Sequence, residues 1–264
     1  MVLPLADDNS DRTITPFVNY GLIAVNVFVF VFLQALGTND NFTNAFSTVP
    51  AEIVTGNDLI TEDREVRDPE SGQFVSIPGL QPTPITVYIT LLTSMFMHGG
   101  IAHILGNMLF LWIFGDNIEN VLGHGRYLAF YLVCGILSSL AHVFSTVALF
   151  GADSPQVQIP SLGASGAISG VLGAYMLLFP TRRVLVLLFR ILTWVPAWVA
   201  VGIWFAFQLI SGLGMLGGQS DGVAYAAHIG GFVVGLALIK LFMIGLPDTA
   251  AEPPSRGVPW PPER

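Results

Sequence analysis

The chain has 264 residues, of which 53% are hydrophobic and only 11% are charged, whereas ordinary soluble domains carry about 25% charged residues. With a mean hydropathy of +0.67, this composition favours a polytopic membrane protein over any soluble domain. The net charge is −8, and no feature of the sequence indicates nucleic-acid binding. Cys134 is the only cysteine and lies in an apolar run, so there is no disulfide framework.

Six apolar segments reach or approach the roughly 20 residues that a helix needs to cross a bilayer. We predict membrane-spanning helices at residues 17–36, 91–114, 127–150, 162–180, 184–213 and 223–246. The first is long enough to span the bilayer rather than to be cleaved as a signal peptide. The fourth is short and rich in glycine, and Pro196 interrupts the fifth.

The segments outside these helices are polar. Residues 1–16 are predicted to form a cytoplasmic tail, and residues 37–88 a long acidic extracytoplasmic loop with a short helix near its end. Residues 247–264 are rich in proline and are predicted to be a disordered cytoplasmic tail. The functional domain is then the six-helix unit at residues 17–246.

Lysine and arginine determine the predicted orientation, because they collect in cytoplasmic loops. With the N-terminus in the cytoplasm, only Arg64 and Arg67 of the 10 basic residues lie outside. We therefore predict an all-α membrane protein with six spans and both termini cytoplasmic. The membrane would be the plasma membrane of a prokaryote or an equivalent bilayer.

Polar side chains fall at a similar depth on three of the predicted spans. The second, fourth and sixth spans all enter from the outer face. Near their starts they carry, in turn, His98, His103 and Asn107, then Ser165, then His228. Polar side chains inside a membrane are costly and usually functional. His103 and Asn107 are four residues apart and share a helix face.

Small residues at every fourth position predict close contact between the fourth and sixth spans, because such stripes let membrane helices approach each other. The stripes are Gly166 and Gly170 on the fourth span, and Ala227, Gly231 and Gly235 on the sixth. This contact would bring the Ser165 hydroxyl within reach of the His228 imidazole.

A serine beside a histidine predicts nucleophilic catalysis, because the imidazole can take the hydroxyl proton near neutral pH. The backbone N–H of Ser165 and the side chains of His103 and Asn107 are candidate donors to an oxyanion. The nearest acidic side chains lie at the inner end of the second span. We therefore predict a Ser165–His228 dyad rather than a triad.

Three motifs in chain order resemble those of the rhomboid intramembrane serine proteases. They are HGGIAHILGNMLFLWIFGDNIE, GASGAISGVLGAY and AYAAHIGGFVVG on the second, fourth and sixth spans, and the resemblance covers about residues 90–245. It implies a six-helix core with a water-filled cavity open to the outer side. It further implies a serine endopeptidase without cofactor or metal, which cleaves transmembrane protein substrates within the lipid bilayer near its outer side.

The resemblance also implies a role for individual residues. Ser165 becomes the nucleophile and His228 the general base. His103, Asn107 and the Ser165 amide surround the oxyanion, and Gly163 belongs to the same group.

Two further positions match the family's pattern, and two depart from it. His98 falls where the family has a histidine near the end of the first loop, and Glu119 matches a structural acid. Ile89-Thr90 stands where many members carry a Trp-Arg pair. Ser169 stands where many members have an aromatic ring stacked on the catalytic imidazole, so we expect packing on the fourth span to orient His228.

Other functions remain open from the sequence. A transporter also places polar groups at mid-depth, but it would usually show inverted repeats, which we do not find. A catalytically inactive relative that binds membrane proteins would usually lack the serine or the histidine. A metal site at His98, His103 and His228 would lack carboxylate or cysteine partners.

The two remaining histidines have no predicted part in catalysis. His142 in the third span is predicted to be structural, and His124 is predicted to be solvated in an inner loop. The sequence fixes neither the substrate nor the oligomeric state.

Overall fold

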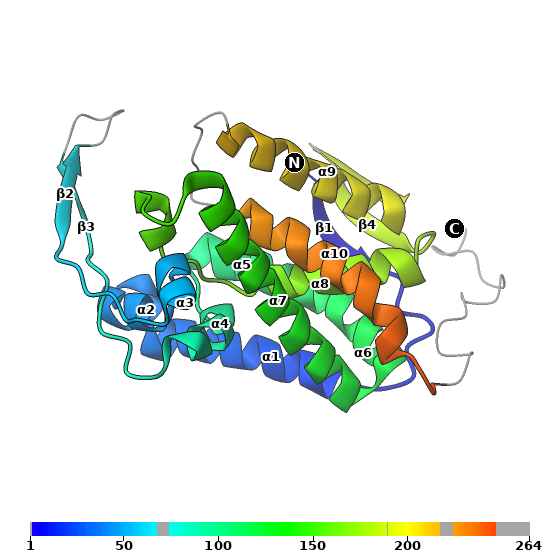
Figure 1. Cartoon of the computed structure of the whole chain (residues 1–264). Helices are drawn as coiled ribbons and strands as arrows, with labels where there is room; N and C mark the ends of the chain where they lie inside the picture. The colour runs from blue at the N-terminus through cyan, green and yellow to red at the C-terminus, as the bar shows by residue number, and fades with distance from the viewer. Residues whose placement is uncertain (1, 68–73, 189, 217–223, 247–264) are drawn as a thin grey trace.

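The computed structural model describes residues 2–67, 74–188, 190–216 and 224–246, and it is mainly a bundle of helices (Figure 1). The long helical segments are α1 (Phe17–Phe28) with η1 (Val29–Leu33), α5 (Ile101–Phe110) with η5 (Leu111–Gly115) and α6 (Asp116–Leu122), α7 (His124–Phe150), α8 (Ser165–Leu178), α9 (Ala197–Leu216) and α10 (Tyr225–Phe242). Each predicted span coincides in part with one of these segments.

Three of the helical segments in the described part of the chain are long and apolar enough to cross a membrane. They are Ile101–Leu122, His124–Phe150 and Tyr225–Phe242. Phe17–Leu33, Ser165–Leu178 and Ala197–Leu213 are apolar but shorter. A membrane-embedded, mostly helical protein is therefore confirmed, whereas the count of six spans and the sides of the termini stay predictions.

Helices α7, α8 and α10 pack against one another, and most residues of α8 are buried. A Cβ added at Gly231 would collide with the carbonyl oxygen of Gly166, and one added at Gly235 with that of Gly170. Toward α7, a Cβ at Gly170 would lie 2.6 Å from the Cβ of Cys134. The two small-residue stripes therefore face each other, as their spacing predicts.

Residues 183–196 form a β-hairpin, which corrects the prediction of a helix from residue 184. Strand β4 (Arg183–Leu188) pairs antiparallel with β5 (Ile191–Pro196), and β1 (Val2–Asp7) pairs antiparallel with the other edge of β4. Val184 and Val186 are buried while their neighbours are more exposed, which is the period of two that a strand requires. Residues 2–7 are therefore part of a sheet, not a tail.

The helix of the second predicted span begins at Ile101 rather than at residue 91, and continues to Leu122. The preceding residues form short turns, η3 (Val87–Ile89), α4 (Thr90–Thr93) and η4 (Ser94–Phe96). Gly99 and Gly100, which are weak helix formers, separate these turns from α5. His98 therefore precedes the helix instead of lying in it.

The loop at residues 37–88 contains more structure than the one short helix expected near its end. It follows η2 (Ala35–Gly37) and includes α2 (Asp40–Phe46) and α3 (Pro50–Thr55). Ile53 of α3 packs with Leu91 and Val143, which ties the loop to α7. Strands β2 (Arg64–Arg67) and β3 (Phe74–Ile77) form a hairpin that extends away from the helices (Figure 1).

Glu119 joins two helices at the end of the bundle opposite this loop. Its buried carboxylate accepts the backbone N–H groups of Val18 and Asn19 in the first turn of α1, at 3.0 and 2.7 Å. These amides have no partner within their own helix. His124 contacts the same carboxylate, so it is not simply solvated as expected. The predicted tail at residues 247–264 lies outside the described residues.

Candidate active site

Ser165 and His228 are in direct contact. The Oγ of Ser165 lies 2.7 Å from the Nε2 of His228. Ser165 is the first residue of α8, and His228 lies in the first turn of α10. The glycine contacts between the two helices produce this approach. Ser138 of α7 adds a hydrogen bond to the carbonyl of Ala227 at 2.9 Å, which fixes the start of α10 beside the serine.

The other nitrogen of the imidazole has a partner that the sequence did not suggest. Nδ1 of His228 lies 2.7 Å from Oε1 of Gln208, a side chain of α9 that is only 6% exposed. Trp204, one turn earlier in α9, has its ring centroid 6.2 Å from that of the imidazole. The one available signal was that Gln208 is the single amide side chain in the apolar sequence of α9.

The partner of Nδ1 thus comes from α9, whereas the sequence led us to expect that packing on the fourth span orients His228. Ser169 of α8, at the position where many relatives have an aromatic, uses its hydroxyl within its own helix and donates to the Ser165 carbonyl. The two nitrogens of His228 thus contact a hydroxyl and an amide, both of which are neutral.

The side chains of His103 and Asn107 each have an N–H donor that can be identified from its surroundings. Nδ1 of His103 accepts the N–H of Gly99 at 3.2 Å, so in the neutral ring Nε2 carries the proton. That nitrogen faces Gly163, because a Cβ added there would lie 2.9 Å from it. Nδ2 of Asn107 is buried and has no hydrogen-bond partner among the described residues.

Two backbone N–H groups near the nucleophile differ in whether they already have a hydrogen-bond partner. The N–H of Ser165 lies at the first position of a helix, where amides have no partner in the preceding turn. The N–H of Gly163 donates to the Ser94 carbonyl at 2.9 Å. The N–H of Gly163, a residue that the sequence grouped with the oxyanion donors, is therefore already hydrogen-bonded in this structure. The φ of +125° at Gly163 and the closeness of His103 explain why glycine is needed there.

His98 lies beside these donors and is held by its backbone. The side-chain amide of Gln34 donates to the His98 carbonyl at 3.0 Å and accepts the His98 N–H at 2.9 Å. The buried ring of His98 meets that of His103 edge-on, with centroids 5.1 Å apart. His98 therefore lies against His103, and Gln34 is a second residue that the sequence did not suggest.

A small polar pocket opens beside Ser165. The loop before α8 forms one wall, where Thr48 and Ser161 exchange backbone hydrogen bonds of 3.0 and 2.8 Å. The lining consists almost entirely of small residues, including Ser94, Gly135, Ser138, Ser139, Ser161, Gly163, Gly166, Ala167, Ala224 and Ala227. The space next to the nucleophile therefore suits a small group.

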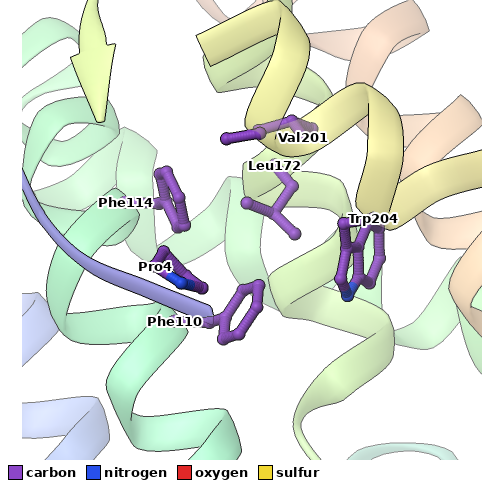
Figure 2. A pocket seen from close by; sticks show the side chains of 7 residues that line it. Pro4, Phe110, Phe114, Leu172, Val201 and Trp204 are labelled. Carbon is purple, nitrogen blue, oxygen red and sulfur yellow. The ribbon is translucent and has the colours of Figure 1, made fainter. Parts of the chain in front are cut away.

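A separate apolar pocket lies where β1, α5, η5, α8 and α9 meet (Figure 2). Its labelled side chains point toward one another from these elements and include Pro4, Phe110, Phe114, Leu172, Val201 and Trp204. Trp204 thus connects this apolar contact region to the imidazole. The residues that line the pocket include no acid, base or nucleophile.

The structure offers no candidate metal centre in the part of the chain that it describes, since no three His, Cys, Asp or Glu side chains are grouped to hold an ion. His98, His103 and His228 do not form such a group. The absence of a metal from the reaction stays a prediction.

Comparisons with known proteins find similarity to a family model and to individual proteins of the same family. A family model described as Rhomboid domain matches residues 86–244. The chain is 35% identical to Rhomboid protein 1, mitochondrial, of Saccharomyces cerevisiae over 163 residues, which is 60% of this chain and 42% of the yeast protein. It is 37% identical to Rhomboid protease GluP of Bacillus subtilis over 143 residues, or 53% of this chain and 26% of GluP.

A human relative extends the comparison. The chain is 31% identical to Presenilin-associated rhomboid-like protein, mitochondrial, of Homo sapiens over 172 residues, which is 61% of this chain and 42% of the human protein. The chain thus spans less than half the length of each of these three relatives.

Proposed function

The chain belongs to the rhomboid family, and we propose that it is an intramembrane serine endopeptidase with Ser165 as nucleophile and His228 as general base. The observation that carries the proposal is the 2.7 Å contact between Oγ of Ser165 and Nε2 of His228. The donors of His103 and Asn107 on the neighbouring helix α5 support it. A catalytically inactive binding protein would have no need of this contact, and a transporter would have no need of the donors.

The reaction follows from these groups. Nε2 of His228 takes the proton of Ser165 as Oγ attacks the carbonyl carbon of the scissile peptide. The Ser165 N–H, the His103 Nε2–H and the Asn107 Nδ2–H donate to the oxyanion. The imidazolium then gives its proton to the leaving nitrogen as the C–N bond breaks. Water, activated by His228, releases the acyl group and restores the serine.

We further propose six spans with both termini cytoplasmic and the nucleophile below the outer surface. Helix α8 has 14 residues and rises about 21 Å, less than the hydrocarbon thickness of about 30 Å. If α8 ends at the inner face, Ser165 lies inside the bilayer and closer to the outer face. This depth supports cleavage of transmembrane segments near the outer side.

The substrates are transmembrane proteins in this proposal, and the small residues beside Ser165 favour a small side chain at the cleaved bond. Residues 17–246 form the protease domain, with residues 37–88 outside and the flanking segments in the cytoplasm. The named relatives include mitochondrial proteins and a bacterial one. Family membership therefore fits a mitochondrial membrane as well as the prokaryotic plasma membrane expected from the sequence.

Labelling with a fluorophosphonate probe tests the proposal directly. Detergent-solubilised protein is treated with the probe, and cleavage of a reporter with one transmembrane segment is followed on a gel. Ser165→Ala and His228→Ala are expected to abolish both signals while keeping the melting temperature. Ser145→Ala is the matched control, because that hydroxyl donates to a carbonyl of its own helix α7. Unchanged cleavage in either dyad variant would contradict the proposal.

A further inference from the structure

We propose that Gln208 is a positioning residue that holds His228 in the tautomer and ring orientation needed to accept the Ser165 proton. This inference rests on the proposed function of Ser165 and His228. It adds a third side chain to the dyad, contributed by a helix that carries neither of the other two.

The first argument is the count of donors and acceptors on the imidazole. A neutral imidazole has one N–H donor and one acceptor nitrogen. Oε1 of Gln208 is an acceptor, so at 2.7 Å it selects the ring with the proton on Nδ1. Nε2 is then the acceptor, and it is this nitrogen that faces the hydroxyl of Ser165. The opposite tautomer would place two lone pairs against each other at Gln208.

The second argument is the location of the amide. Gln208 is almost completely buried in a helix whose other side chains are apolar except for Ser211, and a buried polar side chain is costly unless it is hydrogen-bonded. Its Oε1 has the imidazole as partner. Trp204 lies 6.2 Å from the ring and Tyr225 lies edge-on at 6.3 Å. The amide therefore completes an enclosure that leaves the ring little freedom to rotate.

The third argument is the neutrality of the amide. A carboxylate would also accept from Nδ1, but an ionised group within the hydrocarbon region carries a large desolvation cost. An amide selects the tautomer without introducing a charge. This explains how the site functions although no acid was found to complete a triad.

The test compares two replacements of similar size. Gln208→Met keeps the volume and removes the acceptor, whereas Gln208→Glu keeps acceptor oxygens. We expect Gln208→Met to lower kcat about ten- to a hundredfold with little change in KM or melting temperature. Gln208→Glu is expected to recover most of kcat, at a lower melting temperature because the buried carboxyl group is costly to desolvate. The matched control is Ile210→Ala, because Ile210 lies on the same helix with its side chain 69% exposed.

A spectroscopic measurement separates this inference from the proposed function. In protein labelled with ¹⁵N-histidine, the His228 signals are expected to show Nδ1–H in the wild type and a mixture of tautomers in Gln208→Met. An unchanged tautomer, or a loss of kcat that follows a loss of melting temperature in both variants, would overturn the role of Gln208. Such a result would leave the dyad standing, whereas full activity of Ser165→Ala would remove the dyad itself.

Discussion

Two polar clusters lie toward opposite ends of α8 and differ in how their hydrogen bonds are used. The outer cluster, at the start of α8, consists of His103, Asn107, Ser165, Gln208 and His228. The inner cluster, near the end of α8, consists of Asp7, Asp11, Arg12, Asp116, Asn117, Tyr175 and Arg182. The outer cluster contains no carboxylate, lysine or arginine, and the Asn107 amide donor has no hydrogen-bond partner among the described residues. Inner side chains are mostly charged and bind one another.

The bonds of the inner cluster connect the N-terminal segment to the helices. Asp7 accepts the Tyr175 hydroxyl at 2.7 Å and the Asn117 amide at 2.8 Å. Arg12 pairs with Asp116 at 3.0 Å.

Arg182 completes this network. Its guanidinium pairs with Asp11, donates to Asn117 and lies 3.8 Å above the Phe179 ring. The two ends of α8 therefore differ. The outer cluster has hydrogen-bond donors that a substrate could use, whereas the groups of the inner cluster bind one another and stabilise the fold.

The largest effect is expected from removing the unused donors of the outer cluster. Asn107→Ala and His103→Ala should each lower kcat, because oxyanion donors act mainly in the transition state and one is worth about 10²–10³ in rate. Steady-state kinetics on a transmembrane reporter would measure this. A raised KM with unchanged kcat would mean that these side chains hold the substrate, and the contrast between the clusters would fail.

A second prediction changes the geometry of the outer cluster without touching its polar groups. Gly231→Val forces a branched side chain against the Gly166 carbonyl, so α10 must move and His228 with it. A misplacement of about 1 Å can cost on the order of 10²-fold in rate. We therefore expect losses of both activity and melting temperature.

The control for this variant is Gly21→Val, since a Cβ at Gly21 of α1 meets no atom within 4 Å. Gly212 is less suitable, because a Cβ there would lie 3.3 Å from that of Tyr225. Full activity and an unchanged melting temperature in Gly231→Val would show that the glycine contact does not position the dyad.

These two predictions concern features that the sequence could reveal. The dyad was predictable because stripes of small residues encode helix contact and because span order places polar groups at one depth. Gln208 was not, since its contact depends on how α9 packs against α10, which no local pattern specifies. The β4–β5 hairpin was missed because a hydropathy criterion does not distinguish apolar strands from an apolar helix.

The inner cluster was missed for a related reason. Charged residues at the ends of spans give information about orientation, and Arg182 was counted only as a cytoplasmic charge. Its partners Asp11 and Asn117 are far away in the sequence. The pairing of β1 with β4 brings Asp11 close, and that pairing joins residues nearly two hundred positions apart.

A third prediction separates stability from activity. Arg182→Met should leave Asp11 and Asn117 without their common partner, and removing one member of a buried ion pair costs on the order of 3 kcal/mol. We expect a lower melting temperature but an unchanged kcat for the protein that remains folded, since the dyad lies at the other end of α8. Thermal unfolding in detergent and kinetics below the transition measure the two quantities. A fall in kcat with normal stability would show that the clusters are coupled.

The smallest effect concerns the protonation of Asp7. Burial raises its pKa from 3.8 to about 7, and the hydrogen bond from Tyr175 opposes that rise only in part. Because the folded pKa lies above the unfolded one, the folded state holds more protons between about pH 4 and pH 7, and stability falls as pH rises through this window. The slope is at most about 1.4 kcal/mol per pH unit, and Asp7→Asn should remove it.

Comparing the two proteins isolates this contribution. Glu52 of α3 also has its pKa raised to about 7, chiefly by burial, but it is present in both proteins and cancels in the difference. Melting temperatures at pH 5 and pH 7.5 should therefore differ more for the wild type than for Asp7→Asn, with the wild type losing stability at the higher pH. An equal pH dependence in the two proteins would mean that Asp7 remains charged in the fold. The hydrogen bonds from Asn117 and Tyr175 would then be donated to a carboxylate rather than to a neutral carboxyl group.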